Sequence, residues 1–385
     1  MTESPGFLLT IVAFALVIGP LVFVHEMGHY LVGRWFGIGA DVFSIGFGRE
    51  IAGWTDRRGT RWKLSALPLG GYVKFAGDMN PASQPSADWL ALPAAQRQRT
   101  FQAKPVWQRA LVVLAGPAVN FIVAILVIAG GVIAYGDVRT PPVVAAVNPG
   151  TAAARAGLLA GDRIVAIGGR SMGTFDDIFH YVMIHPRDAV RIDYVRDGTV
   201  RSAQARLGML AEEDRFGNRF ERGLLGVGPP PPVVVRVSPW RAPLVAAGRT
   251  WDYVRLTIDT LAQLVSGRRS IKDMSGPVGM ARAAGEQITL GWTAFVSLIV
   301  LISINLGFIN LLPIPMLDGG YLFFYAIEAV RRRPVTPAVQ EWAFRGGLAA
   351  LLALMFVVTA NDLGKAGLWR GLGQGVGHGL AGLIG

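Results

Sequence analysis

Four long apolar stretches dominate the pattern of hydrophobic and polar residues along the chain. They run from Phe7 to Val24, from about Ala110 to Tyr135, from about Trp292 to Leu312 with a broken continuation to Ile327, and from about Trp342 to Ala360. Each approaches the roughly 20 mostly apolar residues that a helix needs to cross a bilayer. The pattern therefore predicts a polytopic α-helical membrane protein with about four transmembrane helices.

The ends of the first stretch indicate a retained span. A secretory signal peptide has a basic start and a cleavage site of small residues. Here Glu3 precedes the stretch, and His25 and Glu26 follow it directly. A further apolar segment, Leu244 to Val265, carries charged residues along its length, so we expect an amphipathic helix at the membrane surface.

Between the second and third stretches the pattern changes to short strands and turns. Strands are predicted at Val143–Val147, Arg163–Ile167, 190–194 and Gly223–Gly228, helices at Ala152–Leu158 and Asp176–Met183, and a hairpin turn at Asp197-Gly198. These elements indicate one α+β domain, and the residues from Asn148 to Ile164 resemble a bacterial PDZ domain. An unrelated small β domain is the alternative. Whether the strand from Arg222 to Val227 binds a free C-terminus or completes the sheet stays open.

Residues 42–76 alternate between strand-like runs and turns. The runs are Val42–Phe47, Trp62–Leu67 and Gly71–Phe75, and Arg57-Arg58-Gly59 is a turn. Short hairpins beside the first span are the simplest interpretation. Backbone that is not helical persists at membrane depth only where protein covers it or a wet cavity adjoins it. The hairpins should therefore border an aqueous pocket.

The composition supports a membrane location. Charged residues make up 16% of the chain, against about 25% in an average soluble protein. The chain has no cysteine, which excludes disulfide scaffolds and zinc or iron–sulfur sites held by cysteine. The net charge of +11 comes from dispersed residues and one run, Arg331-Arg332-Arg333. We attribute this charge to membrane topology and expect no nucleic-acid partner.

Basic residues near the ends of the spans predict the orientation. Residues 34–109 are rich in arginine and lysine, and the arginine run lies in the short connection between the third and fourth spans. Both regions belong on the cytoplasmic side. The N-terminus, residues 136–290 and the C-terminal tail then lie on the opposite side.

The sharpest chemical signal is His25-Glu26-Met27-Gly28-His29. Residues four apart share one face of a helix, so both imidazoles can bind one zinc ion while Glu26 reaches a water on that ion. The alternative is a polar cluster at the wet end of a helix. Ionisable groups that adjoin a bilayer core are costly and usually functional, which favours the metal site.

Two histidines leave a catalytic zinc one protein ligand short. The other histidines are poor candidates, because His180 and His185 belong to the predicted outer domain and His378 to a glycine-rich tail. A carboxylate is needed instead, and Asp318 is the only acidic residue within residues 287–327.

The surroundings of Asp318 favour a pocket. Pro313 and Pro315 precede it, and Gly319 and Gly320 follow it directly. These residues should break the third span and expose the carboxylate. Counting crossings places Asp318 on the same side of the membrane as the two histidines. A helix-capping aspartate in a reentrant turn is the alternative.

Together these motifs resemble the site-2 protease family of intramembrane zinc metalloproteases, in particular the bacterial regulator of sigma-E protease type. The resemblance covers nearly the whole chain. Besides the motifs around His25 and Asp318, it includes Ser44-Ile-Gly46-Phe-Gly48, residues 68–75, Ala115-Gly116-Pro117 with Asn120, and Ser275-Gly276-Pro277-Val278-Gly279. The best-known relative has two PDZ domains, whereas one is visible here, so a double-domain size filter is not expected.

The resemblance implies one zinc ion per chain, bound by His25, His29 and Asp318. Glu26 would be the general base that activates a water and later protonates the leaving amine.

The resemblance also implies residues that hold the substrate. Asn310 would contact the substrate backbone or the developing oxyanion, although stabilising the broken helix is an equally open role. Asn305 resembles a second asparagine of the family. Gly46 and Gly48 would leave a strand edge accessible, to which an unwound substrate adds by backbone hydrogen bonds.

A member of this family would be a multi-pass protein of the bacterial inner membrane, surrounded by the lipid bilayer. Its PDZ domain would be periplasmic and its active site would lie near the cytoplasmic side. The substrate would be a single-span membrane protein, such as an anti-sigma factor already trimmed on the outer side, or a signal-peptide remnant. Two other classes stay open: a membrane scaffold that recruits partners, and a transporter, for which no inverted repeat is visible.

These interpretations divide the chain into eight parts. We expect residues 1–34 to form the first span with the histidine motif, 35–105 the cytoplasmic-side reentrant β region, 106–135 the second span, 136–230 the PDZ domain, 231–290 an amphipathic periplasmic linker, 291–327 the broken third span, 328–341 a cytoplasmic loop, and 342–385 the fourth span with its tail.

Overall fold

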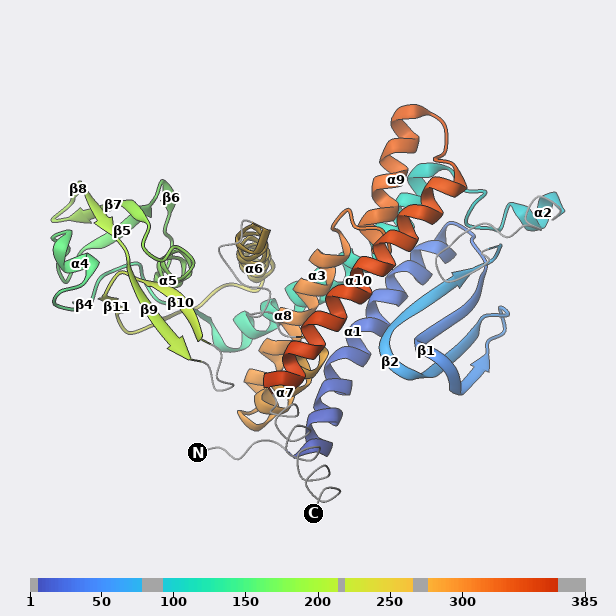
Figure 1. Cartoon of the computed structure of the whole chain (residues 1–385), viewed down its shortest axis with the longest axis horizontal. Coiled ribbons are helices and arrows are strands. Elements are labelled where there is room, and N and C mark those ends of the chain that lie inside the picture. Colours follow the sequence, from blue (N-terminus) through green and yellow to red (C-terminus); the bar gives the residue numbers. More distant parts are fainter. Residues whose placement is uncertain (1–5, 78–92, 214–218, 266–275, 366–385) are drawn as a thin grey trace, which may run out of the picture. The chain divides into compact units, whose positions relative to one another are not determined.

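The computed structural model describes residues 6–77, 93–213, 219–265 and 276–365, which belong to two units (Figure 1). The first unit comprises residues 1–127 and 275–362, and the second comprises residues 128–274 and 363–385. The predicted tail with His378 and the first residue of the motif at Ser275 lie outside the described residues.

Long helices form most of the first unit. Its elements are α1 (Phe7–Trp35), β1 (Ala40–Thr55), β2 (Arg61–Phe75), α2 (Ala94–Arg97), α3 (Val106–Tyr135), α7 (Pro277–Thr289), α8 (Trp292–Asn310), α9 (Asp318–Arg331) and α10 (Pro337–Lys365), with the last turns of α3 in the second unit. Among the described residues, four helices are long and apolar enough to cross a membrane: α1, α3, α8 and the Ala338–Ala360 part of α10. They coincide with the four predicted stretches, so the chain is a polytopic membrane protein.

The third apolar stretch is broken as predicted. Helix α8 ends at Asn310, an irregular turn follows, and α9 begins at Asp318. Pro313 and Pro315 lie within this turn. Proline has no backbone N–H to donate to the helical hydrogen-bond pattern, so a regular helix cannot continue through these positions. The break places the Asp318 side chain at the start of a helix inside the first unit.

Close contacts hold α3 against its neighbours. A Cβ on Gly28 of α1 would lie 2.5 Å from the Ala115 carbonyl oxygen of α3, so only glycine permits this approach. Ser303 of α8 donates a hydrogen bond of 2.8 Å to the Asn120 carbonyl of α3. Small residues and interhelical hydrogen bonds of this kind are how helices associate in lipid.

Strands β1 and β2 bend, so that together they behave as four short segments. Residues 42–45 pair with 71–74 on one side and with 61–64 on the other. Residues 50–55 pair with the opposite edge of 61–65. The predicted short strands are therefore present. Their order in the sheet is not that of successive hairpins, because the first segment lies between the last and the third.

Glycines mark the bends of this sheet. Gly46 and Gly48 have φ angles of 85° and 87°, which side chains rarely adopt. A Cβ on Gly46 would lie 2.6 Å from the Leu67 carbonyl oxygen. The glycine therefore lets the strand turn close to β2.

The second unit contains a small α+β domain. Its elements are β3 (Asp137–Arg139), β4 (Ala146–Val147), α4 (Ala152–Arg155), β5 (Arg163–Ile167), β6 (Arg170–Ser171), α5 (Phe175–Met183), β7 (Ala189–Arg196), β8 (Thr199–Arg206), β9 (Gly208–Glu213), β10 (Arg219–Leu224), β11 (Val227–Gly228), β12 (Val233–Val235) and α6 (Ala242–Val265). Strands β6, β5, β7 and β8 form an antiparallel sheet in that order. Buried aliphatic residues such as Ile164, Ile178 and Ile192 form the core between this sheet and α5.

Three predicted elements of this domain are shorter than expected or interrupted, and one of them is the helix expected at Ala152–Leu158, which ends at Arg155. The strand expected at Gly223–Gly228 is split, because Gly226 has a φ of 86° and turns the chain against Thr151. The strand expected at Val143–Val147 is reduced to β4 and one isolated bridge from Val143 to Arg163. The predicted turn at Asp197-Gly198 is confirmed, with positive φ at both residues between β7 and β8.

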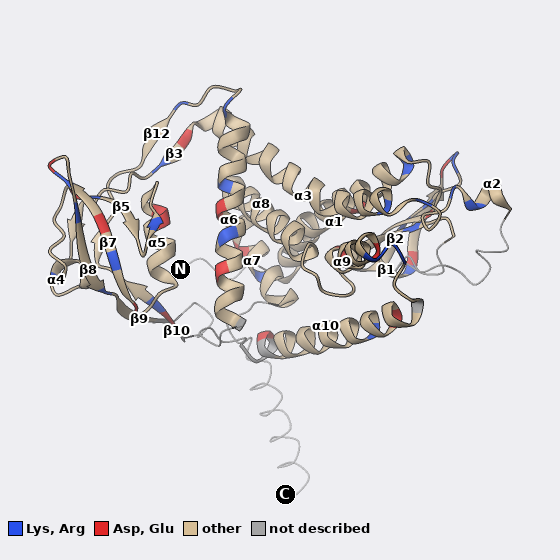
Figure 2. Ribbon diagram, turned by 90° about the horizontal axis from the view of Figure 1, so that it is seen from above, with Lys and Arg blue, Asp and Glu red and all other residues tan. Residues whose placement is uncertain are grey.

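Helix α6 carries basic and acidic residues along its length (Figure 2) and is not among the candidate spans. Two ion pairs tie it to the rest of its unit. Arg249 pairs with the fully buried Asp137 of β3, and Asp259 accepts a hydrogen bond of 2.8 Å from Arg170 of β6. The helix is therefore anchored both to the strand that follows α3 and to the domain.

A buried ion pair between Asp162 and Arg196 lies at the start of β5. Asp162 is 1% exposed and accepts two hydrogen bonds of 2.7 Å from Arg196 and one of 2.8 Å from the Leu159 amide. Burial alone would raise the pKa of Asp162, but Arg196 and these hydrogen bonds outweigh burial and hold that pKa below its ordinary value.

Replacing Asp162 with asparagine should destabilise the domain by about 1–3 kcal/mol, because Arg196 loses its charged acceptor. Hydrogen exchange of β5 and β7 amides in the full chain should accelerate accordingly. Since the folded carboxyl has the lower pKa, the wild-type stabilisation is present above the ordinary carboxyl pKa and is lost as the pH falls through the folded value. The exposed Asp176→Asn is the control, and unchanged exchange in Asp162→Asn would contradict the prediction.

Candidate metal centre

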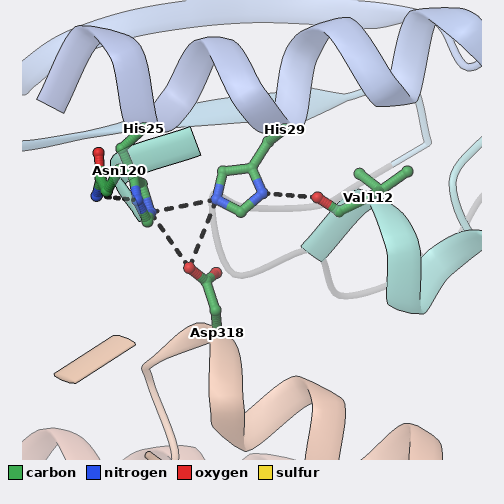
Figure 3. Close-up of polar contacts among 5 residues, drawn as sticks. All are labelled: His25, His29, Val112, Asn120 and Asp318. Carbon is green, nitrogen blue, oxygen red and sulfur yellow. Dashed lines mark hydrogen bonds and ion pairs between the residues drawn. The ribbon is translucent and has the colours of Figure 1, made fainter. Parts of the chain in front are cut away.

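Helix α1 carries His25 and His29 one turn apart, with their Nε2 atoms 3.3 Å apart. Asp318, the first residue of α9, points toward both imidazoles (Figure 3), and its Oδ2 lies 3.2 Å from His25 Nε2 and 3.6 Å from His29 Nε2. The three candidate ligand atoms all lie within 4.8 Å of one another. The fold therefore brings together the three residues that the sequence predicts as metal ligands.

The surroundings of Asp318 fit a metal ion. Its Oδ2 atom is buried, and no group among the described residues is aligned to form a hydrogen bond with it. A buried carboxylate oxygen without such a partner is costly unless another positive group meets it. Two imidazole nitrogens and one carboxylate oxygen are a donor set of catalytic zinc sites, which keep a further position for water.

A backbone carbonyl of α3 orients His29. Its Nδ1–H donates a hydrogen bond of 2.9 Å to the Val112 carbonyl oxygen, which leaves the Nε2 lone pair free to face a metal. The ring lies directly on Gly116, where an added Cβ would be 2.2 Å from His29 Nε2. The sequence pattern contained Gly116 but did not indicate this contact.

A side chain of α3 contacts the other imidazole. The Asn120 amide lies 3.1 Å from His25 Nδ1, and both residues are buried, at 0% and 7% exposed. Sequence reasoning assigned Asn120 no role beyond its place in a motif. The one sequence signal for Asn120 was its polar side chain on a predicted span, and this signal did not indicate the contact with His25.

Glu26 lies between the two histidines on the buried face of α1. It borders the same cavity as the histidines and Asp318, and it packs against β2, where an added Cβ on Gly71 would lie 3.0 Å from Glu26 Cγ. The glutamate is therefore held by the sheet on one side and open to the cavity on the other.

The turn before Asp318 holds one residue in an unusual conformation. Met316 has a φ of 84°, in a region that residues other than glycine rarely occupy. Its side chain packs with the cluster of Phe324, Val335 and Phe344 and also borders the cavity. Such local strain persists only where the surrounding structure enforces it, and it occurs most often at functional sites.

The metal centre opens onto a cavity of about 630 Å³. Residues 70–73 of β2 and Asn310 line it beside the candidate ligands. Asn305, Gly46 and Gly48 do not line it. Of the four residues predicted to hold the substrate, the structure therefore places only Asn310 at the cavity.

The two described histidines outside the motif do not join the metal centre. His180 and His185 belong to the second unit, and His185 Nδ1 donates to the Tyr181 carbonyl over 2.6 Å. Within the described residues, the candidate metal-binding group consists of His25, His29 and Asp318 alone.

Two histidines one helical turn apart, a glutamate between them and a distant carboxylate are the groups of a zinc-dependent metallopeptidase. The chain matches the model of peptidase family M50 over residues 13–354. It belongs to this family, whose members are intramembrane zinc metalloproteases.

Three relatives agree with this classification. The chain is 44% identical to a protein of Agrobacterium fabrum named as a zinc metalloprotease, over 358 residues that cover 92% of this chain and 95% of the relative. It is 43% identical to a similarly named protein of Rhizobium meliloti over 360 residues, covering 92% and 96%. It is 36% identical to Metalloprotease MmpA of Caulobacter vibrioides over 392 residues, covering 96% and 98%. The chain is thus a metalloprotease with zinc as its cofactor.

A solved structure is similar to part of the chain. The PDZ domain of a SdrC-like protein from Listeria monocytogenes is 24% identical, and the match covers 25% of this chain and 88% of that domain with a TM-score of 0.18. The PDZ identity of residues 136–230 stays a prediction.

Gly116→Ala should strip the metal centre of its ion, because the new Cβ would overlap the His29 ring. Metal content of the purified protein, measured by mass spectrometry, checks this outcome. Gly130→Ala is the matched control, since it makes the same change on the same helix where nothing lies within 4 Å. Equal metal content in the two variants would show that the close contact at Gly116 is not required.

Proposed function

We propose that His25, His29 and Asp318 bind one zinc ion and that Glu26 is the general base for hydrolysis of a peptide bond within the membrane. The convergence of the three ligand atoms from α1 and α9, within 4.8 Å of one another, carries this proposal. The bound zinc supplies a Lewis acid that makes a water nucleophilic near neutral pH.

Glu26 moves the proton in this reaction. Its carboxylate takes a proton from the attacking water and returns it to the amine that leaves. The close approach of Gly71 to the Glu26 side chain restricts its position at the edge of the cavity. Catalysis then depends on positioning as much as on the acidity of the group.

The substrate lies in the cavity as an extended segment. A peptide bond inside a helix has its carbonyl shielded, so the substrate unwinds before attack. Residues 71–74 pair with 42–45 on one side, and no described strand pairs with their other side. Since 42–45 are paired on both sides, we place the accepting edge at 71–73, beside the cavity, instead of next to Gly46 and Gly48. Asn310 is positioned to contact the substrate backbone.

The biological setting follows from the topology that the charge pattern predicts. We place the protein in the bacterial inner membrane, with the metal centre toward the cytoplasm and the α+β domain in the periplasm. Its substrates are single-span membrane proteins, such as an anti-sigma factor after a first cleavage on the outer side, or signal-peptide remnants. The domain excludes proteins whose outer part is still bulky.

Zinc content tests the proposed ligands. Detergent-purified wild type should hold about one zinc per chain, and His25→Ala and Asp318→Asn should each lose most of it, because a catalytic zinc site has about three protein ligands. His180→Ala is the control, since its imidazole belongs to the second unit. Full zinc in Asp318→Asn would mean that the third ligand is another group.

Glu26→Gln should retain zinc but lower the cleavage of a single-span reporter by roughly 10²–10⁴-fold, the usual contribution of a general base. The amide preserves the shape of the side chain and cannot take up the proton. Glu50→Gln is the matched control, because Glu50 lies on β1 and pairs with Arg61 of β2. Cleavage by Glu26→Gln at the wild-type rate would exclude Glu26 as the base.

A further inference from the structure

The two imidazoles of the metal centre meet different groups at their Nδ1 atoms. His29 Nδ1 lies 2.9 Å from the Val112 carbonyl oxygen, which can only accept a hydrogen bond. His25 Nδ1 lies 3.1 Å from the side-chain amide of Asn120, which has a donor end and an acceptor end. Both contacts come from α3, two turns of the helix apart.

Metal binding through Nε2 determines which end of the Asn120 amide can form a hydrogen bond with His25 Nδ1. An imidazole that binds a metal through Nε2 carries its remaining proton on Nδ1 and needs an acceptor there. The Val112 carbonyl meets this need for His29. In the structure the Asn120 nitrogen faces His25, and an NH₂ group suits only the tautomer with its proton on Nε2.

A half-turn of the amide resolves the mismatch. Rotation about the last side-chain bond exchanges Nδ2 and Oδ1 and leaves the volume of the side chain almost unchanged. Asn120 Oδ1 is buried and has no hydrogen-bond partner among the described residues, so the rotation breaks no bond of the oxygen. The backbone stays in place, because Ser303 donates to the Asn120 carbonyl over 2.8 Å.

We propose that Asn120 is a positioning residue whose side-chain carbonyl accepts a hydrogen bond from His25 Nδ1–H and so sets the tautomer and ring orientation for metal binding through Nε2. The inference rests on the metal site proposed above. It gives α3 a defined role, since both histidines of α1 then receive their outer hydrogen bonds from this one helix.

The test is zinc affinity, measured by competition with a chelator of known affinity, on full-length protein in detergent. Asn120→Leu keeps the size of the side chain and removes the acceptor, so zinc should bind about 10–100-fold more weakly, as for other residues that orient metal ligands. Asn120→Asp keeps an acceptor in the same place and should bind zinc at least as tightly as wild type. Ser303→Ala, which removes a hydrogen bond to the same residue, should stay within about threefold of wild type.

Cobalt substitution gives a second readout. The visible absorption bands of the cobalt protein report ligand geometry, and they should shift in Asn120→Leu but not in Asn120→Asp or Ser303→Ala. Zinc affinity of Asn120→Leu within about threefold of wild type would overturn the role of Asn120. Weakened binding in Asn120→Asp would overturn it as well, and this variant decides the matter if the leucine protein does not fold.

The outcome also separates this inference from the proposed function. Wild type that binds no zinc would overturn the metal site and the role of Asn120 together. A different result would overturn the role of Asn120 alone: wild type binds zinc, His25→Ala binds little zinc, and Asn120→Leu binds zinc as tightly as wild type.

Discussion

The close approach of α1 and α3 is the constraint on which the metal centre depends. Gly28 allows the two backbones to touch, and Gly116 leaves space for an imidazole ring between them. At this distance the Val112 carbonyl reaches one histidine and the Asn120 side chain reaches the other. Protein interiors are packed too densely for such contacts to form independently, so a wider crossing would remove both hydrogen bonds together.

The third candidate ligand, Asp318, comes from a segment that could not be a regular helix. The turn between α8 and α9 exposes backbone groups, which are tolerated at membrane depth only where protein covers them or a wet cavity adjoins them. The cavity beside Asp318 meets this condition. Helix α9 is then held to α3 by a 2.6 Å ion pair between Arg109 and Glu328, with Arg109 also lying over the Tyr325 ring. One helix thus supports both halves of the centre.

Hydrophobic pattern and local chemistry predict much of this arrangement, because both depend on neighbours in the chain. The four spans, the break before α9 and the pairing of Asp318 with the histidine motif all follow from run length, proline positions and the scarcity of acids. The contact of Val112 with His29 could not be predicted, since every residue has a carbonyl and the sequence does not say which helices touch. The order of the β1 and β2 segments was missed for the same reason: pairing across a sheet is set by bends at residues such as Gly46.

The groups that form the centre are synthesised at very different times. Helix α1 leaves the ribosome well before α9, because two further spans and an entire folded domain lie between them in the chain. A chain that stops before α9 carries both histidines and the glutamate but lacks the carboxylate that faces them. Under the proposed function, a nascent chain therefore cannot hydrolyse the other proteins of its membrane until α9 has been synthesised.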